Sequence, residues 1–301
     1  MRKYSNGRRK DKTIGSAITN GLSFDVEEFF HAHNLARAAP ADRWDSFPSR
    51  VQLQLELILG ALDEAGVKAT FFFLAWVAER HAGIVKRVLS QGHEIATHGY
   101  GHQFVYRQSR AQFGEDLKKS VAILEDITGR RVLGYRAPSF SITNDCLWAL
   151  DVIKEAGLRY DSSLFPVHLG NRGGVASRFV PHEIRSGLCE MPVASMPFMG
   201  VRLPLSGGFY FRFFPYSLTR WGIGRINRRG EPVVLYFHPW EFDSSQPVLK
   251  GIPAFPKYRH YVNLKTNLVK LNALLKSFRW APLREVLLDW EKGNSPESKI
   301  A

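Results

Sequence analysis

A short run near the N-terminus combines the residue types of a buried strand with three acids. SFDVEEFF, residues 23–30, has the Phe and Val content of a strand in a core but carries Asp25, Glu27 and Glu28. A buried, ionised carboxylate is costly unless a cation or hydrogen bonds compensate it. Because side chains alternate along a strand, Asp25 and Glu27 are expected on one face. Glu28 is then expected on the other face, in solvent or in a salt bridge. The pattern predicts a positive group beside Asp25 and Glu27.

Two histidines later in the chain could supply metal ligands. His98 and His102, in HEIATHGYGH, have the i, i+4 spacing of the histidines in H-E-x-x-H metal sites, one helical turn apart. With a carboxylate from the first strand, they would form a site of two histidines and one acid with positions open for water or substrate. His31 and His33 form a rival pair closer to the acids.

Three further residues could orient groups or transfer protons. Arg136, in GYRAPSF, could orient Asp25 and keep it ionised, because a neighbouring cation lowers the pKa of a carboxylate. His238, in LYFHPWEF, ends an apolar strand and could donate a proton. Asp161, in RYDSSLF, is the carboxylate expected to orient that imidazole, with the capping of a turn as its alternative role.

These residues fall near the ends of predicted strands that alternate with predicted helices. Strands are predicted within residues 22–29, 68–75, 93–98, 132–138, 159–165 and 232–242. Helices are predicted for residues 50–65, 81–91, 111–129, 144–157 and 263–278. Residues 166–215 are rich in Pro and Gly and are expected to be looser. The alternation favours β-α units around a parallel sheet, in which the carboxyl ends of the strands share one face.

Length and charge limit the class of protein. The 301 residues suffice for one large α/β domain, and the longest apolar run, residues 69–78, is half of what a membrane-spanning helix needs. The basic start of the chain is not followed by the apolar stretch of a secretory signal, so a cytoplasmic protein is expected. Cys146 and Cys189 form no C-x-x-C motif, which agrees with a reducing compartment.

The net charge of +13 raises the question of an anionic partner. No helix-turn-helix, RRM or zinc-finger pattern accompanies the charge, so a nucleic-acid partner is not expected. The basic tail could instead bring the protein to the inner face of a membrane. We expect a flexible basic tail over residues 1–20, a single catalytic domain with a C-terminal helical extension over 21–290, and a flexible tail over 291–301.

Taken together, these motifs resemble the polysaccharide deacetylases (NodB-homology, carbohydrate esterase family 4), and among them the bacterial subgroup associated with exopolysaccharide and exosortase systems. The resemblance rests on FDVEEFF, HEIATHGYGHQ, YRAPSFS, YDSSLFP, GGFYFRFFP and YFHPWEFD, in this order. It implies an α/β fold, a distorted (β/α) barrel of about seven parallel strands. One position departs from the best-known members, which have a metal-binding aspartate where this chain has Val26.

The resemblance also implies a role for each site residue. Asp25 would be the catalytic base, oriented by Arg136, and His238 the general acid with Asp161 as its partner. Glu27, His98 and His102 would hold a divalent metal ion, expected to be Zn²⁺. The implied substrate is a carbohydrate with N-acetyl groups, either a polysaccharide or its lipid-linked precursor. The aromatic stretch GGFYFRFFPYSLTRW and Trp240 could offer faces for sugar stacking or could pack in the core.

Two other functions remain open from the sequence. One is a cyclic amide or imide hydrolase of the allantoinase-like kind, because some relatives with a similar first motif act on small cyclic amides. The other is a catalytically silent carbohydrate-binding protein, against which the retention of the whole predicted set of acid, base and ligands argues.

Overall fold

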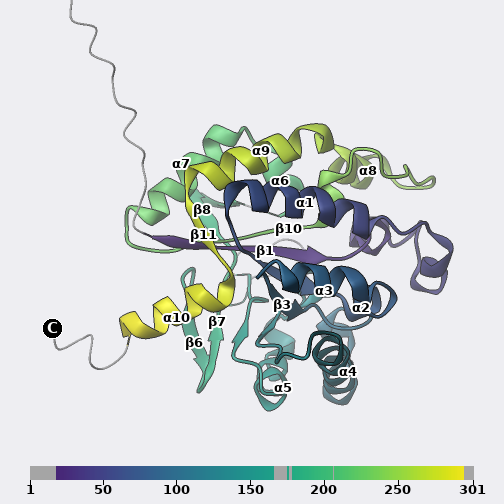
Figure 1. The fold of residues 1–301 in the computed structure, drawn as a ribbon, viewed down its shortest axis with the longest axis horizontal. Helices are drawn as coiled ribbons and strands as arrows, with labels where there is room; N and C mark the ends of the chain where they lie inside the picture. Colours follow the sequence, from purple (N-terminus) through teal and green to yellow (C-terminus); the bar gives the residue numbers. More distant parts are fainter. Residues whose placement is uncertain (1–17, 166–174, 176–177, 206, 295–301) are drawn as a thin grey trace, which may run out of the picture.

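The computed structural model describes residues 18–165, 175, 178–205 and 207–294 of the chain (Figure 1). The first strand, β1, begins at Thr19 and the last helix, α10, ends at Asn294. Regular structure therefore extends slightly beyond the expected domain bounds of 21 and 290. Residues 1–17 and 295–301 of the expected tails lie outside the described residues.

Seven parallel strands form the main row of the sheet, in the order β10-β1-β2-β3-β4-β5-β7. β6 is added antiparallel to β7, and β11 pairs in parallel with the start of β1. The strands are β1 (Thr19–Val26), β2 (Thr70–Phe73), β3 (Glu94–Thr97), β4 (Gly134–Tyr135), β5 (Tyr160–Asp161), β6 (His182–Arg185), β7 (Leu188–Glu190), β10 (Val234–Phe237) and β11 (Arg279–Ala281). The predicted α/β fold of about seven parallel strands is confirmed.

The row curls so that its two ends approach each other. Val193, just after β7, forms an isolated parallel bridge with Val234 of β10. The amide of Ala194 also donates to the carbonyl of Val234 over 2.8 Å. The sheet is therefore a half-barrel, and the carboxyl ends of its parallel strands face a common region.

Helices surround this sheet, and two of them, α6 and α8, contribute to the cavity described below (Figure 1). The helices are α1 (Val51–Ala65), α2 (Ala75–Arg80), α3 (Ala82–Ser90), α4 (Arg110–Thr128), α5 (Trp148–Glu155), α6 (Gly208–Phe213), α7 (Tyr216–Asn227), α8 (Ala254–Tyr261), α9 (Leu264–Ser277) and α10 (Leu283–Asn294). Four of the five predicted helices agree to within about a residue. In the fifth, predicted for 144–157, a short 3-10 turn (Asn144–Cys146) precedes α5.

The expectation of a loose region over residues 166–215 is wrong for most of its described part. That part holds β6, β7, α6 and a separate hairpin of β8 (Ser195–Phe198) and β9 (Val201–Pro204). The glycines that suggested loops occupy turns: Gly187 and Gly200 have φ of 79° and 81°, a conformation that glycine adopts without strain. Residues 166–174, 176–177 and 206 lie outside the described residues.

The amphipathic pattern of α1 shows why the core forms where it does. Its buried face carries Leu55, Ile58, Leu59 and Leu62, as the helical spacing predicts. This face joins the aromatic side chains of β1 and β2, where the rings of Phe24 and Phe71 stack with centroids 5.0 Å apart. Packing on this side of the sheet fixes the direction of β1, and with it the position of the acids at its end.

Candidate active site

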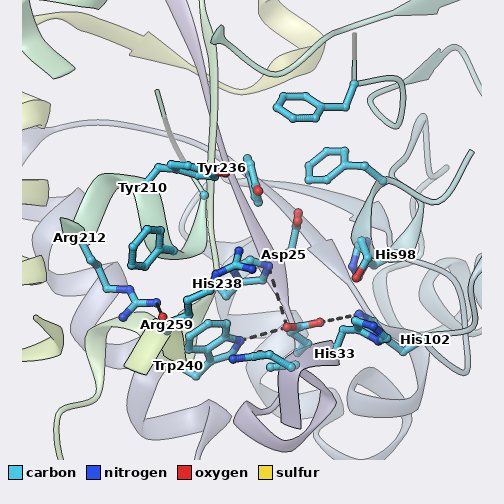
Figure 2. A pocket seen from close by; sticks show the side chains of 18 residues that line it. Asp25, His33, His98, His102, Tyr210, Arg212, Tyr236, His238, Trp240 and Arg259 are labelled. Atoms are coloured by element: carbon cyan, nitrogen blue, oxygen red, sulfur yellow. Dashed lines mark hydrogen bonds and ion pairs between the residues drawn. The ribbon is translucent and has the colours of Figure 1, made fainter. Parts of the chain in front are cut away.

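A cavity of about 540 Å³ lies at the carboxyl ends of the strands (Figure 2). Its volume is in the range of small-molecule binding sites. It is lined by five of the seven predicted site residues: Asp25, Glu27, His98, His102 and His238. Arg136 and Asp161 are fully buried.

Three of these residues form a cluster with the geometry of a metal site. Glu27, His98 and His102 each offer one ligand atom, and these atoms lie within 4.8 Å of one another. His102 Nε2 is 2.7 Å from Glu27 Oε2. His98 Nδ1 donates to the carbonyl of Arg136 over 2.8 Å, which leaves Nε2 for the cluster. A second hydrogen bond of this kind typically orients a metal-binding histidine.

The charge states in the cluster suit a divalent cation. Burial lowers the pKa of His98 to about 4, so its ring is neutral and can act as a ligand. Burial opposes ionisation of Glu27, but His102 and His238 together hold its pKa well below the usual range. Trp240 Nε1 also donates to Glu27 Oε1 over 3.0 Å. Two imidazoles and one carboxylate are a donor set that fits Zn²⁺.

The histidine pair is not on a helix, which corrects the local structure inferred from its spacing. His98 directly follows β3, and the chain then turns through Gly99, with φ 78°, and His102, with φ 51°. Asp116 of α4 holds this turn by accepting from the amides of Tyr100 at 2.9 Å and Gly101 at 3.2 Å. The turn brings the two rings to a centroid separation of 5.5 Å.

Asp25 is held by the arginine predicted to orient it. Arg136 Nη1 donates to Asp25 Oδ1 over 2.6 Å, and both side chains are buried. The same nitrogen donates to Ser23 Oγ at 2.8 Å, while Nε and Nη2 donate to the carbonyl and hydroxyl of Ser162 at 3.2 and 2.8 Å. The guanidinium also stacks over Phe72, 4.2 Å from the ring centroid. Arg136 has no freedom to leave Asp25 without breaking several contacts.

His238 has a different partner from the one predicted. Its Nδ1 donates to Glu241 Oε1 over 2.7 Å, in a 3-10 turn over Pro239–Phe242. Burial lowers the pKa of His238, but Glu241 and, more weakly, Glu27 outweigh burial and raise it to about 9. The expectation that Asp161 orients His238 is therefore wrong. The sequence did carry a signal for Glu241, because Pro239 favours a turn that brings the residue three positions after His238 back onto it.

Asp161 belongs to a separate buried pair of acids. It is the register partner of Glu190 on β7, and the two carboxyl groups share a hydrogen bond. Ser163 Oγ donates to Asp161 as well. Burial raises the pKa of both acids, that of Asp161 to about 6, because neither has a described cation as a direct ion-pair partner.

Glu28 is buried and caps a helix, whereas solvent or a salt bridge was expected. The strand ends at Val26, and the Glu28 carboxylate accepts from Ser49 Oγ and from the amides of Arg50, at 3.0 Å, and Val51, at 3.3 Å. It thus binds the N-terminus of α1, where unpaired amides favour an anion. Of the three acids in residues 23–30, Asp25 and Glu27 line the cavity and Glu28 caps α1.

The rival histidine pair does not join the cluster in the described structure. His31 Nδ1 accepts from the amide of Glu28 at 3.0 Å, and its ring packs against Trp44 and Trp76. Its ring lies 6.1 Å from that of His102. His33 lines the cavity, and its ring packs against Phe104.

The aromatic stretch is divided between the cavity wall and the core. Phe209 and Tyr210 of α6 line the cavity, whereas Phe211 is buried in the core. Gly207 must be glycine here, because it has φ 82° and a Cβ would lie 1.9 Å from the ring of Tyr236. This close approach lets Tyr236 reach the cavity wall.

Backbone strain also gathers at the cavity. In the described part of the chain five non-glycine residues have positive φ, and three of them line it: His102, Ser139 and Phe140, at 51°, 55° and 54°. Such conformations cost about 1–3 kcal/mol each and are kept where the surroundings impose them, commonly at functional sites. No sequence pattern indicated these positions.

Two segments of the chain match known protein families. Residues 44–160 match the polysaccharide deacetylase family, and residues 162–288 match a domain of unknown function, DUF3473. A peptidoglycan deacetylase-like protein of Gibberella zeae is 32% identical over 109 residues, 36% of this chain and 31% of that protein. A peptidoglycan-N-acetylglucosamine deacetylase of Bacillus cereus is 34% identical over 95 residues, 31% of this chain and 34% of that protein. The chain thus spans about a third of the length of the curated relatives it matches.

Solved structures share the fold over nearly the whole chain. A probable polysaccharide deacetylase of Pseudomonas aeruginosa has a TM-score of 0.59 at 14% identity, covering 92% of this chain and 91% of that one. The Puue allantoinase has a TM-score of 0.61 at 15% identity, with the same coverage. The sheet draws β1–β5 from before residue 162 and β7 and β10 from after it, and the run with Asp25 and Glu27 precedes both matched segments. Residues 44–160 thus resemble the polysaccharide deacetylase family, and residues 162–288 resemble the DUF3473 domain that follows it.

Proposed function

We propose that the protein is a metal-dependent hydrolase that removes N-acetyl groups from N-acetylhexosamine units of a polysaccharide or its lipid-linked precursor, in exopolysaccharide biosynthesis. One observation carries the proposal: Glu27, His98 and His102 converge in a cavity that also contains Asp25 and His238. The relatives named as peptidoglycan deacetylases support the substrate class.

Glu27, His98 and His102 would hold the metal ion, and their donor set favours Zn²⁺. When bound, a divalent cation supplies Lewis acidity, which polarises an acetamide carbonyl and makes a water molecule easier to deprotonate. The carboxylate ligand is a glutamate, whose side chain is one methylene longer than that of aspartate. The hydrogen bond from Trp240 Nε1 to Glu27 Oε1 limits the movement of this longer side chain.

Asp25 would take the proton from the water that attacks the acetamide carbon. Arg136 binds Oδ1 of Asp25, which leaves Oδ2 as the oxygen for this proton. The buried guanidinium also keeps the carboxylate in one orientation, so that base and water need no rearrangement.

His238 would protonate the amine as the carbon–nitrogen bond breaks, giving acetate and a free amino sugar. Glu241 accepts from Nδ1 of His238, so Nε2 is the atom that carries the proton towards the cavity. Glu241 acts through His238 and is a positioning residue.

The proposal is tested by measuring acetate and amine release from chitotetraose, with allantoin and cyclic imides as competing substrates. We expect hydrolysis of the N-acetylated sugar, its loss after chelation, and its return on addition of Zn²⁺. Hydrolysis of the cyclic amides alone would assign the protein to the allantoinase-like class, whose fold it shares. Binding of chitotetraose without turnover at any metal loading would support the silent carbohydrate-binding alternative.

A lipid-linked substrate would require the protein to reach a membrane surface. No helix within the described ranges is both long and apolar enough to cross a membrane. The basic N-terminal tail is the segment proposed for contact with anionic lipids at the cytoplasmic face, and residues 1–17 of it lie outside the described structure.

A further inference from the structure

One cation in the cavity wall has no assigned role in deacetylation. Arg259, near the end of α8, lines the same cavity as Asp25 and His238 and is partly exposed. The ion pairs found among the described residues do not include it. Its guanidinium lies 5.6 Å from the ring centroid of Phe209 and 5.9 Å from that of Phe255.

The neighbouring cations are fully engaged, which sets Arg259 apart. Arg212 is buried, pairs with Glu241 at 3.2 Å, and donates to three carbonyls at the end of α8, those of Arg259, His260 and Val262, at 2.6–2.9 Å. Lys270 Nζ donates in the same way to three carbonyls at the end of α6. Both cations satisfy helix ends.

The same contacts fix Arg259 relative to the proposed general acid. Arg212 binds the backbone carbonyl of Arg259 on one side and Glu241, the partner of His238, on the other. Burial and the positive charge of Arg259 both lower the pKa of Arg212, so the two cations lie close together, and only Arg212 is paired with Glu241 among the described ion pairs. An anion bound at Arg259 would relieve this repulsion.

Arg259 lies on the side of His238 that is away from His98 and His102 (Figure 2). Figure 2 shows Arg212 and Arg259 at the left and His98 and His102 at the right, with His238 between them. A group bound by Arg259 would therefore belong to a sugar next to the one that loses its acetyl group, not to that sugar itself.

We propose that Arg259 forms a subsite for an anionic group, a carboxylate or a phosphate, carried by the unit adjacent to the N-acetylhexosamine. The inference rests on the proposed deacetylase function and deepens it by naming the substrate class. A guanidinium presents a planar fork of donors that matches both groups, and its bond to an anion is stronger than one between neutral partners. The anion could be the carboxylate of a uronic acid in the glycan or a phosphate of a lipid-linked precursor.

The experiment compares three probes on the wild type and on Arg259→Gln: chitotetraose, which is neutral, a hyaluronan tetrasaccharide with a uronate beside each N-acetylglucosamine, and chitobiosyl phosphate. We expect the wild type to prefer one anionic probe, and Arg259→Gln to lower kcat/KM for it by roughly 10- to 100-fold while changing that for chitotetraose little. The preferred probe distinguishes carboxylate from phosphate.

Lys257→Gln is the matched control, because it removes an exposed positive charge from the same helix at a residue that does not line the cavity. Two results would overturn the subsite: an equal loss of kcat/KM on neutral and anionic probes in Arg259→Gln, or a loss of the preference for the anionic probe in Lys257→Gln as large as that in Arg259→Gln.

Titration calorimetry of the same probes tests the subsite separately from the proposed deacetylase activity. If nothing is hydrolysed, tighter binding of an anionic probe that Arg259→Gln abolishes still supports the subsite, and equal binding of all three refutes it.

Discussion

Glu241 accepts a hydrogen bond from Nδ1 of His238 over 2.7 Å and pairs on its other side with Arg212 at 3.2 Å. Both Glu241 and Arg212 are fully buried, so the carboxylate is held between two positively charged groups. This arrangement fixes the plane of the imidazole and joins the cavity to the end of α8.

Glu241→Gln should therefore reduce turnover while leaving substrate binding nearly intact. We expect kcat to fall by roughly 10- to 100-fold with little change in KM, because the general acid loses its orientation and part of its charge stabilisation. Steady-state kinetics on chitotetraose measures both constants. Asp161→Asn is the control, since Asp161 pairs with Glu190 instead. A larger loss of kcat in Asp161→Asn than in Glu241→Gln would contradict the assignment.

Asp25→Asn tests the proposed base. The substitution preserves shape and removes the ability to accept a proton, so kcat is expected to fall by about 10²- to 10⁴-fold. Metal content should stay at the wild-type level, because Asp25 is not one of the three clustered ligands. Deacetylation near the wild-type rate would show that another group accepts the proton.

Arg136→Met tests the buried ion pair through stability. The variant leaves Asp25 charged and buried without its cation, so the free energy of unfolding should fall by about 3–5 kcal/mol. Urea denaturation of the metal-free protein measures this change in the free energy of unfolding. The double variant Asp25→Asn/Arg136→Met should recover part of the loss, since it removes the uncompensated charge. Equal destabilisation of the single and double variants would mean that packing of Arg136, not its charge, matters.

The pair of Asp161 and Glu190 predicts a dependence of stability on pH. Burial raises the pKa of Asp161 from 3.8 to about 6 and raises that of Glu190 as well. The folded protein thus keeps protons that the unfolded chain releases, and the contribution of the pair is complete below about pH 4. The part due to Asp161 is lost as pH rises through about 6. Urea denaturation between pH 4 and 8 should show that the free energy of unfolding of the wild type falls with rising pH. The fall should be shallower in Glu190→Gln. Glu64→Gln is the control, because Glu64 is exposed. If the free energy of unfolding of Glu190→Gln fell with pH as steeply as that of the wild type, the two acids would not share a proton.

The parts of the fold set by local pattern were predictable. The 3.6-residue spacing of Leu55, Ile58 and Leu62 gave α1, and the alternation of apolar strands with helices gave the parallel sheet. The end of β1 at Val26 was not visible, because Glu28 leaves the strand to bind the N-terminus of α1, a contact 22 residues away in sequence.

The site also has features that local sequence patterns predicted and features that they did not. Residue types and strand ends indicated Asp25, Glu27, His98, His102, Arg136 and His238, all but Arg136 lining one cavity. The partner of His238 depends on a turn, and the approach of His102 to Glu27 depends on a positive φ at His102. Arg259 comes to the cavity through the packing of α8 against other elements, which no local pattern encodes.

The metal content of the purified protein tests the central claim most directly. Plasma mass spectrometry would be applied to wild type, to His98→Ala/His102→Ala and to His81→Ala, a control histidine that does not line the cavity. We expect about one transition metal per chain in wild type and His81→Ala, and none in the double variant, with deacetylation lost alongside the metal. Absence of metal from wild type even after reconstitution with Zn²⁺, or an unchanged content in the double variant, would contradict the assignment of Glu27, His98 and His102 as a metal site.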